Sequence, residues 1–142
     1  MRINQMTQTI IGAAIEVHRH LGPGLLESAY EAALCRELDL QRLAYQRQKP
    51  LALTYKGITL PVSYRRYLVV SNAVVVEVKA VETVLPIHEA QLLTYLKLGG
   101  YQVGLLLSFN VSQLRDGMVQ KVLGLPESAT TISASSASLR SS

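Results

Sequence analysis

The sequence predicts a single α/β domain in which helices lie on the faces of a mixed β-sheet. Runs of β-branched and aliphatic residues, bounded by turn residues, predict strands in the middle of the chain and near its C-terminal end. Amphipathic patterns before and between those runs predict helices. The 142 residues, 49% of them hydrophobic, are enough for one domain with its own core.

The first two elements are predicted to be helices. Apolar residues recur at helical spacing over residues 5–20. Gly22-Pro23-Gly24 has the backbone freedom and the fixed φ of a tight reversal, so a second helix is expected from Leu25 to about Leu40. Glu27 lies in the first turn of this helix. The helix dipole favours a glutamate there in any case, so the position fits either a structural or a functional role.

The next stretch, residues 45–62, is predicted to form strands. Pro50 lies inside the run Tyr45–Tyr55 and cannot donate to a hydrogen-bond ladder, which favours an edge strand or a strand interrupted by a bulge. Lys56-Gly57 then predicts a turn into a further strand at Ile58–Val62.

A hairpin is predicted at the centre of the chain. Tyr67–Val70 forms one strand, Ser71-Asn72 the turn and Val74–Lys79 the other strand, whose initial valines indicate burial on both faces. Because Tyr67 and Glu77 are equally far from the turn, the hairpin is expected to place them opposite each other.

The C-terminal part of the domain is predicted to contain a helix and a strand. Pro86 begins the helix and Gly99-Gly100 ends it, with a polar stripe formed by His88, Gln91 and Tyr95. Tyr101–Phe109 is predicted to be a buried strand. The weaker pattern of Val111–Leu123 fits a short helix or an irregular return.

The domain is expected to span residues 1–125. Seven of the last fifteen residues are serine, which predicts a disordered Ser-rich tail over residues 126–142. Cys35 is the only cysteine, which excludes an internal disulfide and a cysteine-rich zinc site. With no apolar run of about 18–20 residues and no apolar N-terminal segment, neither a membrane span nor a secretory signal is expected, and a cytoplasmic location follows.

Glu77 and Lys79 are candidate functional residues because they alternate with valines at the end of the buried strand. The period of two places both side chains on one face. Such a pair is costly to desolvate, so either it forms a local ion pair or it serves a purpose. A metal ion and a phosphate would use both groups, because the carboxylate binds the cation and the lysine steadies phosphoryl charge.

Basic residues gather just before this strand. The net charge is +4, and six cations crowd one central stretch: Arg42, Arg47, Lys49, Lys56, Arg65 and Arg66. This pattern fits a surface that binds DNA or RNA, for which we single out Arg47, Lys49, Arg65 and Arg66, and it also fits a solvated basic face.

Several motifs, taken together, resemble a known family. The segment Gly24-Leu25-Leu26-Glu27-Ser28-Ala29-Tyr30 has the form G-x-x-E-x-x-Y. Tyr64-Arg65, the run from Val76 to Glu82 and the run from His88 to Leu96 follow in the order expected. Over about residues 5–123 the chain resembles the GxxExxY proteins of the PD-(D/E)XK nuclease superfamily.

The resemblance implies a restriction-endonuclease-like αβββαβ core and hydrolysis of nucleic-acid phosphodiesters with Mg²⁺ or Mn²⁺ as cofactor. Glu27 and Glu77 would match the metal-binding carboxylates. Glu77, Lys79 and Gln91 would match the catalytic residues, with Gln91 positioning substrate or water.

One position departs from the family pattern. Tyr67 stands where the family has an aspartate on the strand before E-x-K, in the segment Tyr64-Arg65-Arg66-Tyr67-Leu68. A neutral phenol is a poor Mg²⁺ ligand, so the motif is degenerate here and metal binding is expected to be weak. Three alternatives stay open: an active nuclease, a degenerate fold that binds nucleic acid without cutting it, and a protein-interaction module. A homo-oligomer is compatible with each.

Overall fold

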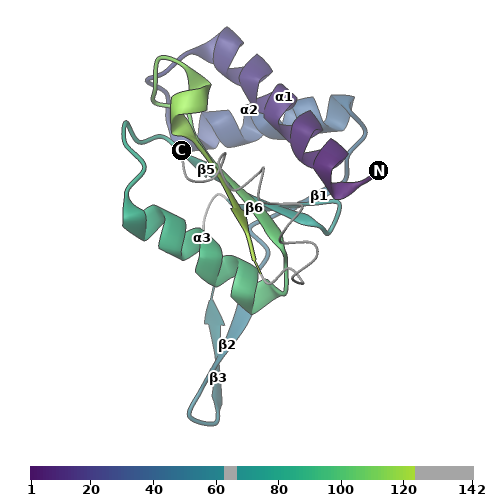
Figure 1. Cartoon of the computed structure of the whole chain (residues 1–142), viewed down its shortest axis with the longest axis vertical. Coiled ribbons are helices and arrows are strands. Elements are labelled where there is room, and N and C mark those ends of the chain that lie inside the picture. The colour runs from purple at the N-terminus through teal and green to yellow at the C-terminus, as the bar shows by residue number, and fades with distance from the viewer. Residues whose placement is uncertain (63–66, 124–142) are drawn as a thin grey trace.

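The computed structural model describes residues 1–62 and 67–123 (Figure 1). The expected tail at 126–142 and the basic residues Arg65 and Arg66 therefore lie outside the described residues. In the described ranges, no helix is both long and apolar enough to cross a membrane.

The described chain forms three α-helices, a short 3₁₀ helix, and strands in two sheets. The helices are α1 (Ile3–Leu21), α2 (Glu27–Leu40), α3 (Pro86–Gly99) and the 3₁₀ helix η1 (Leu114–Gly117). The main sheet has the order β1-β4-β5-β6-β7, formed by β1 (Tyr45–Arg47), β4 (Tyr67–Val70), β5 (Val74–Lys79), β6 (Val103–Ser108) and β7 (Met118–Val122). A separate hairpin pairs β2 (Leu51–Tyr55) with β3 (Ile58–Val62).

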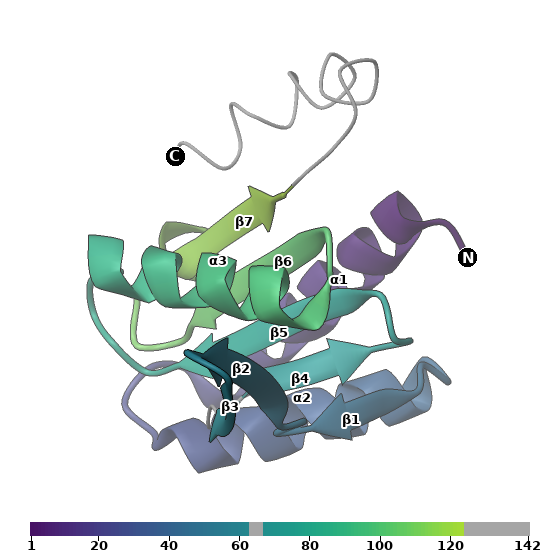
Figure 2. The same cartoon turned by 90° about the horizontal axis from the view of Figure 1, so that it is seen from below.

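The main sheet is mixed and covered by helices on both faces. Only β5 and β6 are parallel, while the pairs β1–β4, β4–β5 and β6–β7 are antiparallel. Helices α1 and α2 lie on one side of the sheet and α3 on the other (Figures 1 and 2). With the hairpin set aside, the order α2-β1-β4-β5-α3-β6 matches the predicted αβββαβ core, so the predicted restriction-endonuclease-like fold class is confirmed.

Alternate residues of the central strands belong to two hydrophobic clusters, one on each face of the sheet. Val74 and Val76 pack toward α1 and α2, whereas Val75 packs toward α3, and all three are fully buried. The prediction of a strand buried on both faces is therefore confirmed for β5.

The loop between α1 and α2 is held by one tyrosine. Gly24 adopts a φ of 104°, which an L side chain rarely tolerates. The Tyr30 hydroxyl donates to the Gly22 carbonyl at 2.5 Å and accepts from the Leu25 N–H at 3.1 Å. The Tyr30 ring stacks on Phe109, with centroids 4.6 Å apart. These contacts fix where α2 begins and hence where Glu27 lies.

The run Tyr45–Tyr55 divides differently from the prediction. β1 is an edge strand of the main sheet, as predicted, but the chain then leaves that sheet, and β2 pairs only with β3. Gln48 has a positive φ of 54°, which turns the backbone, and Pro50 has no N–H for a ladder. The edge-strand alternative is therefore confirmed for residues 45–47, and the alternative of a strand interrupted by a bulge is wrong.

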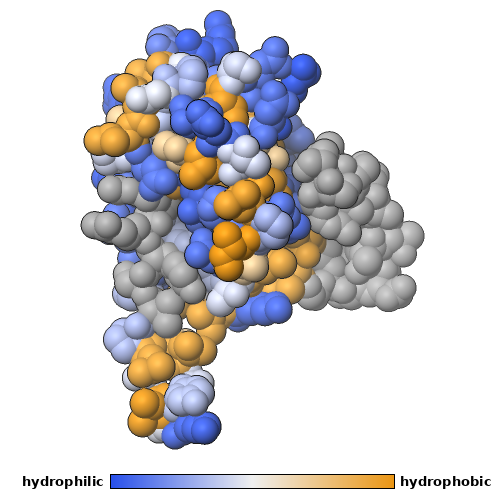
Figure 3. Space-filling model, turned by 90° about the vertical axis from the view of Figure 1, so that its left-hand side faces the viewer, coloured by the Kyte–Doolittle hydropathy of each residue, from blue (hydrophilic) through white to orange (hydrophobic). Residues whose placement is uncertain are grey.

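The β2–β3 hairpin projects from the body (Figures 1 and 3). In Figure 1 it lies beyond the C-terminal part of α3. Its register pairs Leu53 with Leu60 and Tyr55 with Ile58, so these four apolar side chains share one face. All four are exposed to solvent.

The region from Val111 to Leu123 contains a strand that the prediction missed. After η1, β7 adds antiparallel to β6, with Leu106 opposite Val119. The apolar residues of this short strand are too few to reveal it from periodicity alone. Its position depends on the neighbouring strand already being in place.

Candidate functional site

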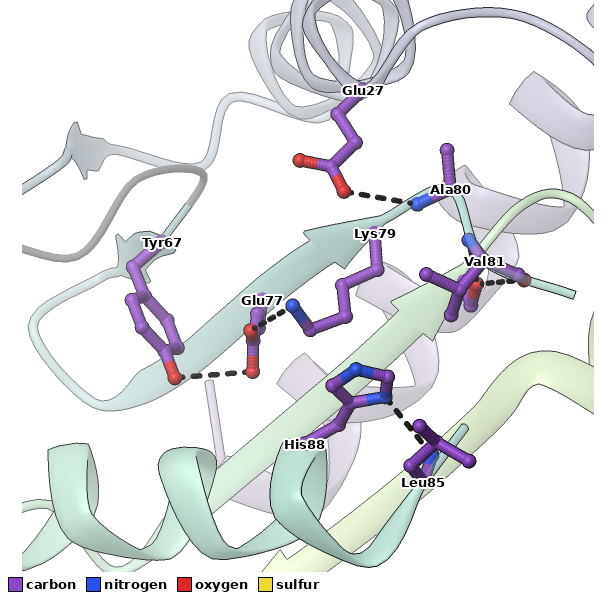
Figure 4. A network of polar contacts seen from close by, with 9 residues as sticks. Glu27, Tyr67, Glu77, Lys79, Ala80, Val81, Leu85 and His88 are labelled. Carbon is purple, nitrogen blue, oxygen red and sulfur yellow. Dashed lines mark hydrogen bonds and ion pairs between the residues drawn. The ribbon is translucent and has the colours of Figure 1, made fainter. Parts of the chain in front are cut away.

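Glu77, Lys79 and Tyr67 form one polar group at the end of β5 (Figure 4). Lys79 Nζ lies 3.1 Å from Glu77 Oε2, which confirms that the two side chains share a face. Tyr67 pairs with Glu77 across the β4–β5 ladder, and its hydroxyl donates to Glu77 Oε1 at 3.1 Å. Each oxygen of the Glu77 carboxylate is thus already engaged by a donor.

Glu77 is buried, with only 4% of the residue exposed. Burial raises the pKa of Glu77, because removal from water disfavours the charged form. The charge and hydrogen bond of Lys79 and the hydrogen bond from Tyr67 act in the opposite direction, while the Glu27 charge raises the pKa further. The ionised form of Glu77 therefore depends on these two donors.

Glu27 reaches the same strand end from the first turn of α2. Its Oε2 accepts a hydrogen bond from the Ala80 N–H at 3.3 Å, directly after β5. In Figure 4 the Glu27 carboxylate points toward the strand end from the side opposite His88, with Lys79 between them. The two predicted metal-binding carboxylates, Glu27 and Glu77, are brought to one end of the sheet.

His88, from the first turn of α3, is a further member of this group. Its Nδ1 accepts a hydrogen bond from the Leu85 N–H at 2.9 Å. Burial lowers the pKa of His88, and the Lys79 charge lowers it further, against a smaller opposite effect of Glu27. The sequence pattern placed His88 only in a polar stripe and assigned it no role. Its place three residues after the helix cap was the available signal.

The remaining members of that stripe behave differently. Tyr95 is fully buried, so its inclusion in a polar stripe was wrong. Its ring stacks on Tyr67, with centroids 4.2 Å apart, and its hydroxyl donates to the Lys49 carbonyl at 2.7 Å. Gln91 is partly buried, and no other described residue forms a hydrogen bond with its side chain. In the described part of the chain, Gln91 therefore forms no hydrogen bond with the carboxylates.

The two described members of the predicted substrate-binding set have intramolecular partners. Arg47 Nη2 lies 3.2 Å from Oε1 of Glu31, whose side chain is fully buried, and this contact raises the pKa of Arg47. Lys49 Nζ donates to the Tyr101 hydroxyl at 3.1 Å. The roles of Arg47, Lys49, Arg65 and Arg66 toward a substrate stay predictions.

Glu27 and Glu77 together fit one common way in which proteins bind a divalent cation. Residues 1–62 and 67–123 contain no group of three or more His, Cys, Asp or Glu that could hold a metal. Mg²⁺ is, however, commonly held by one or two carboxylates together with water and substrate phosphate, and Glu27 with Glu77 fit that mode. Tyr67, predicted from the sequence to replace a motif aspartate, lies beside Glu77 as a hydrogen-bond donor.

Within residues 1–62 and 67–123, neither Glu82 nor Glu89 joins Glu27 and Glu77 in a group of three acidic residues that could hold a metal. Glu89 is paired with Lys121, its Oε1 lying 2.6 Å from Lys121 Nζ. Glu82 is exposed to solvent.

Comparison with known proteins agrees with this geometry. The sequence model of the PD-(D/E)XK nuclease superfamily matches residues 4–122, a range that contains nearly all of α1 and every later described element. No curated protein and no solved structure matches. Because the match covers most of the 142 residues, the chain belongs to the PD-(D/E)XK nuclease superfamily.

Proposed function

We propose that this protein hydrolyses phosphodiester bonds of DNA or RNA at the end of β5, with a low affinity for its divalent metal. The observation behind the proposal is the buried Glu77 carboxylate, held between Lys79 and Tyr67 at the strand end that Glu27 also reaches. Membership of a nuclease superfamily supports the reaction class.

Each polar residue proposed for this site would have its own role in the reaction. Glu27 and Glu77 would hold Mg²⁺ or Mn²⁺, which acts in such sites as a Lewis acid and lowers the pKa of bound water. The Lys79 ammonium, now beside Glu77, would offset the charge that develops on the phosphate. Gln91, from α3, would help to position substrate or water.

We also propose that the chain is of the GxxExxY type within the superfamily. The three named positions have physical roles here: Gly24 adopts its positive φ, Glu27 contacts Ala80, and Tyr30 clamps the loop before α2. The contacts of Gly24 and Tyr30 would thus position Glu27 at the start of α2. The proposed nuclease-like domain spans residues 1–125, and a reducing cytoplasm is the proposed location because the only thiol, Cys35, is a buried free cysteine.

The nucleic acid would lie against the basic stretch between α2 and β5. No carboxylate occurs between Asp39 and Glu77, whereas six cations do. A stretch of this charge suits a polyanion, and phosphate contacts would make binding depend strongly on salt.

A second candidate is nucleic-acid binding without cleavage. It is favoured by the Tyr67–Glu77 hydrogen bond, because the tyrosine both replaces an acidic ligand and engages an oxygen that a metal would need. The two candidates share the binding surface and differ only in turnover.

Cleavage and binding should be measured separately. Wild type, Glu77→Gln and Lys79→Met would be incubated with single- and double-stranded DNA and RNA in Mg²⁺, in Mn²⁺ and in chelator. The proposal predicts slow cleavage, faster at high metal concentration, that is lost in both variants and in chelator. Salt-dependent binding of the same oligonucleotides without any cleavage would instead select the second candidate. Absence of both binding and cleavage would rule out both.

A further inference from the structure

The tautomer of His88 is determined by its contact with the backbone. The Leu85 N–H donates to His88 Nδ1 at 2.9 Å. A backbone N–H can only donate, so Nδ1 must be the acceptor and cannot also bear a proton. The ring proton therefore lies on Nε2.

This Nε2–H faces the proposed active site. In Figure 4 the edge of the ring away from Leu85 is directed toward Lys79, on the side where Glu77 and Glu27 also lie. Both Lys79 and Glu27 influence the pKa of His88, as expected for groups that share one site. In the described part of the chain, no residue accepts a hydrogen bond from Nε2.

The same geometry disfavours a role as metal ligand. A metal would need the lone pair of Nε2, and the proton would then have to move to Nδ1. That change would leave the Leu85 N–H facing another N–H and remove the cap of α3. His88 is thus arranged as a donor to an anion.

We infer that His88 donates its Nε2–H to a non-bridging oxygen of the phosphodiester bound at Glu27, Glu77 and Lys79, and so acts as a catalytic residue. The inference rests on the proposed function and names one more group for the same site. A fixed neutral donor stabilises charge that grows on the phosphate and needs no proton transfer. No bond of the ring is made or broken in this role.

Two substitutions separate this role from helix capping. His88→Ala removes both the cap and the donor. His88→Gln places at the third helical position a residue that can itself accept the Leu85 N–H in a capping box, but it removes the Nε2–H from the site. His88→Gln is therefore the matched control for stability.

Single-turnover cleavage of an oligonucleotide, its equilibrium binding with Mg²⁺ present, and thermal unfolding would be measured for the three proteins. We expect His88→Gln to unfold within a few degrees of wild type, and His88→Ala to unfold earlier. Both should reduce the cleavage rate about 100-fold, the effect typical of one lost donor to a developing oxyanion. Should the wild type bind without cleaving, the affinity should fall about tenfold in both, which corresponds to one charge-assisted hydrogen bond.

An independent readout is the ¹⁵N spectrum of the His88 imidazole. The proton should be found on Nε2 in the free protein, and the Nε2 resonance should move more than that of Nδ1 when the oligonucleotide binds. A proton on Nδ1, or full cleavage and binding in His88→Gln, would overturn the role of His88 and leave the proposed function intact. A wild type that neither binds nor cleaves would overturn both.

Discussion

Tyr67 and Glu77 stand opposite each other in adjacent antiparallel strands, joined by a hydrogen bond of 3.1 Å from the phenol to the carboxylate. The Tyr67 ring is almost fully buried and stacks on Tyr95. Tyr67, predicted from the sequence to replace a motif aspartate, is a donor here, and its hydrogen bond lowers the pKa of Glu77 against the effect of burial. Tyr67 and Lys79 therefore engage both oxygens of the Glu77 carboxylate.

Tyr67→Asp should strengthen metal binding. It adds a charged oxygen opposite Glu77, and we expect Mg²⁺ and Mn²⁺ affinity to rise by about 10- to 100-fold, because Coulomb attraction at a partly shielded site amounts to several kcal/mol before desolvation. The shortened side chain leaves a cavity, so a loss of about 3–5 kcal/mol in unfolding free energy is expected as well. Calorimetric titration with each metal and denaturant unfolding would measure the two effects.

Tyr67→Asn is the control, since it creates a cavity of the same size without the charge. It should lose as much stability as Tyr67→Asp but gain no metal affinity. Cleavage should increase only in Tyr67→Asp and vanish when Lys79→Ala is added. Equal metal affinity in the Asp and Asn variants would show that the missing carboxylate does not limit binding.

The stability of the protein should fall relative to Glu77→Gln as the pH rises. The folded-state pKa of Glu77 is raised by burial, so the folded protein holds this proton at a pH where the unfolded chain has released it. Between the ordinary pKa near 4.5 and the raised value, unfolding releases a proton, and each step upward in pH costs stability. Urea unfolding of both proteins from pH 4 to 7 tests the sign. If the difference in stability between the two proteins stays constant with pH, or shifts in favour of the wild type as the pH rises, the pKa of Glu77 is not raised by burial.

Arg47→Met should reduce stability more than it reduces nucleic-acid binding. Arg47 compensates the fully buried Glu31, although its own side chain is 48% exposed. Because water reaches the arginine, the loss should be about 2 kcal/mol, less than the roughly 3–5 kcal/mol for a wholly buried pair. Adding Glu31→Gln should restore part of the lost unfolding free energy, as measured by chemical denaturation. A variant of normal stability with a large loss of binding would assign Arg47 to the substrate instead.

Gly117→Ala should destabilise the protein, whereas Gly12→Ala should not. A methyl group at Gly117 would overlap the backbone carbonyl of Ser108, and strand β6 would have to move. Overpacking of this kind costs about 1–3 kcal/mol. Gly12 lies within α1 with open space around it, so alanine there should gain up to about 1 kcal/mol from helix propensity. Thermal unfolding of the two variants would show whether the effects have opposite signs.

The sequence by itself determined the features that depend on local periodicity. The period of two along β5 places Glu77 and Lys79 on one face, and the short Ser71-Asn72 turn sets Tyr67 against Glu77. The beginning of α3 at Pro86 and its end near Gly100 follow from proline and glycine chemistry in the same way. Each of these relationships spans at most about a dozen residues, within which backbone geometry leaves few alternatives.

Only the tertiary structure decided which distant residues meet. Glu27 and His88 reach the end of β5 because α2 and α3 pack on opposite faces of the sheet and both begin at that end. Arg47 pairs with Glu31, and Tyr95 is buried against Tyr67, for the same reason. Strand β7 and the separation of β2 from the main sheet depend on the pairing of neighbours far along the chain. Such contacts result from the burial of whole helix and sheet faces, a non-directional driving force whose outcome no local pattern contains.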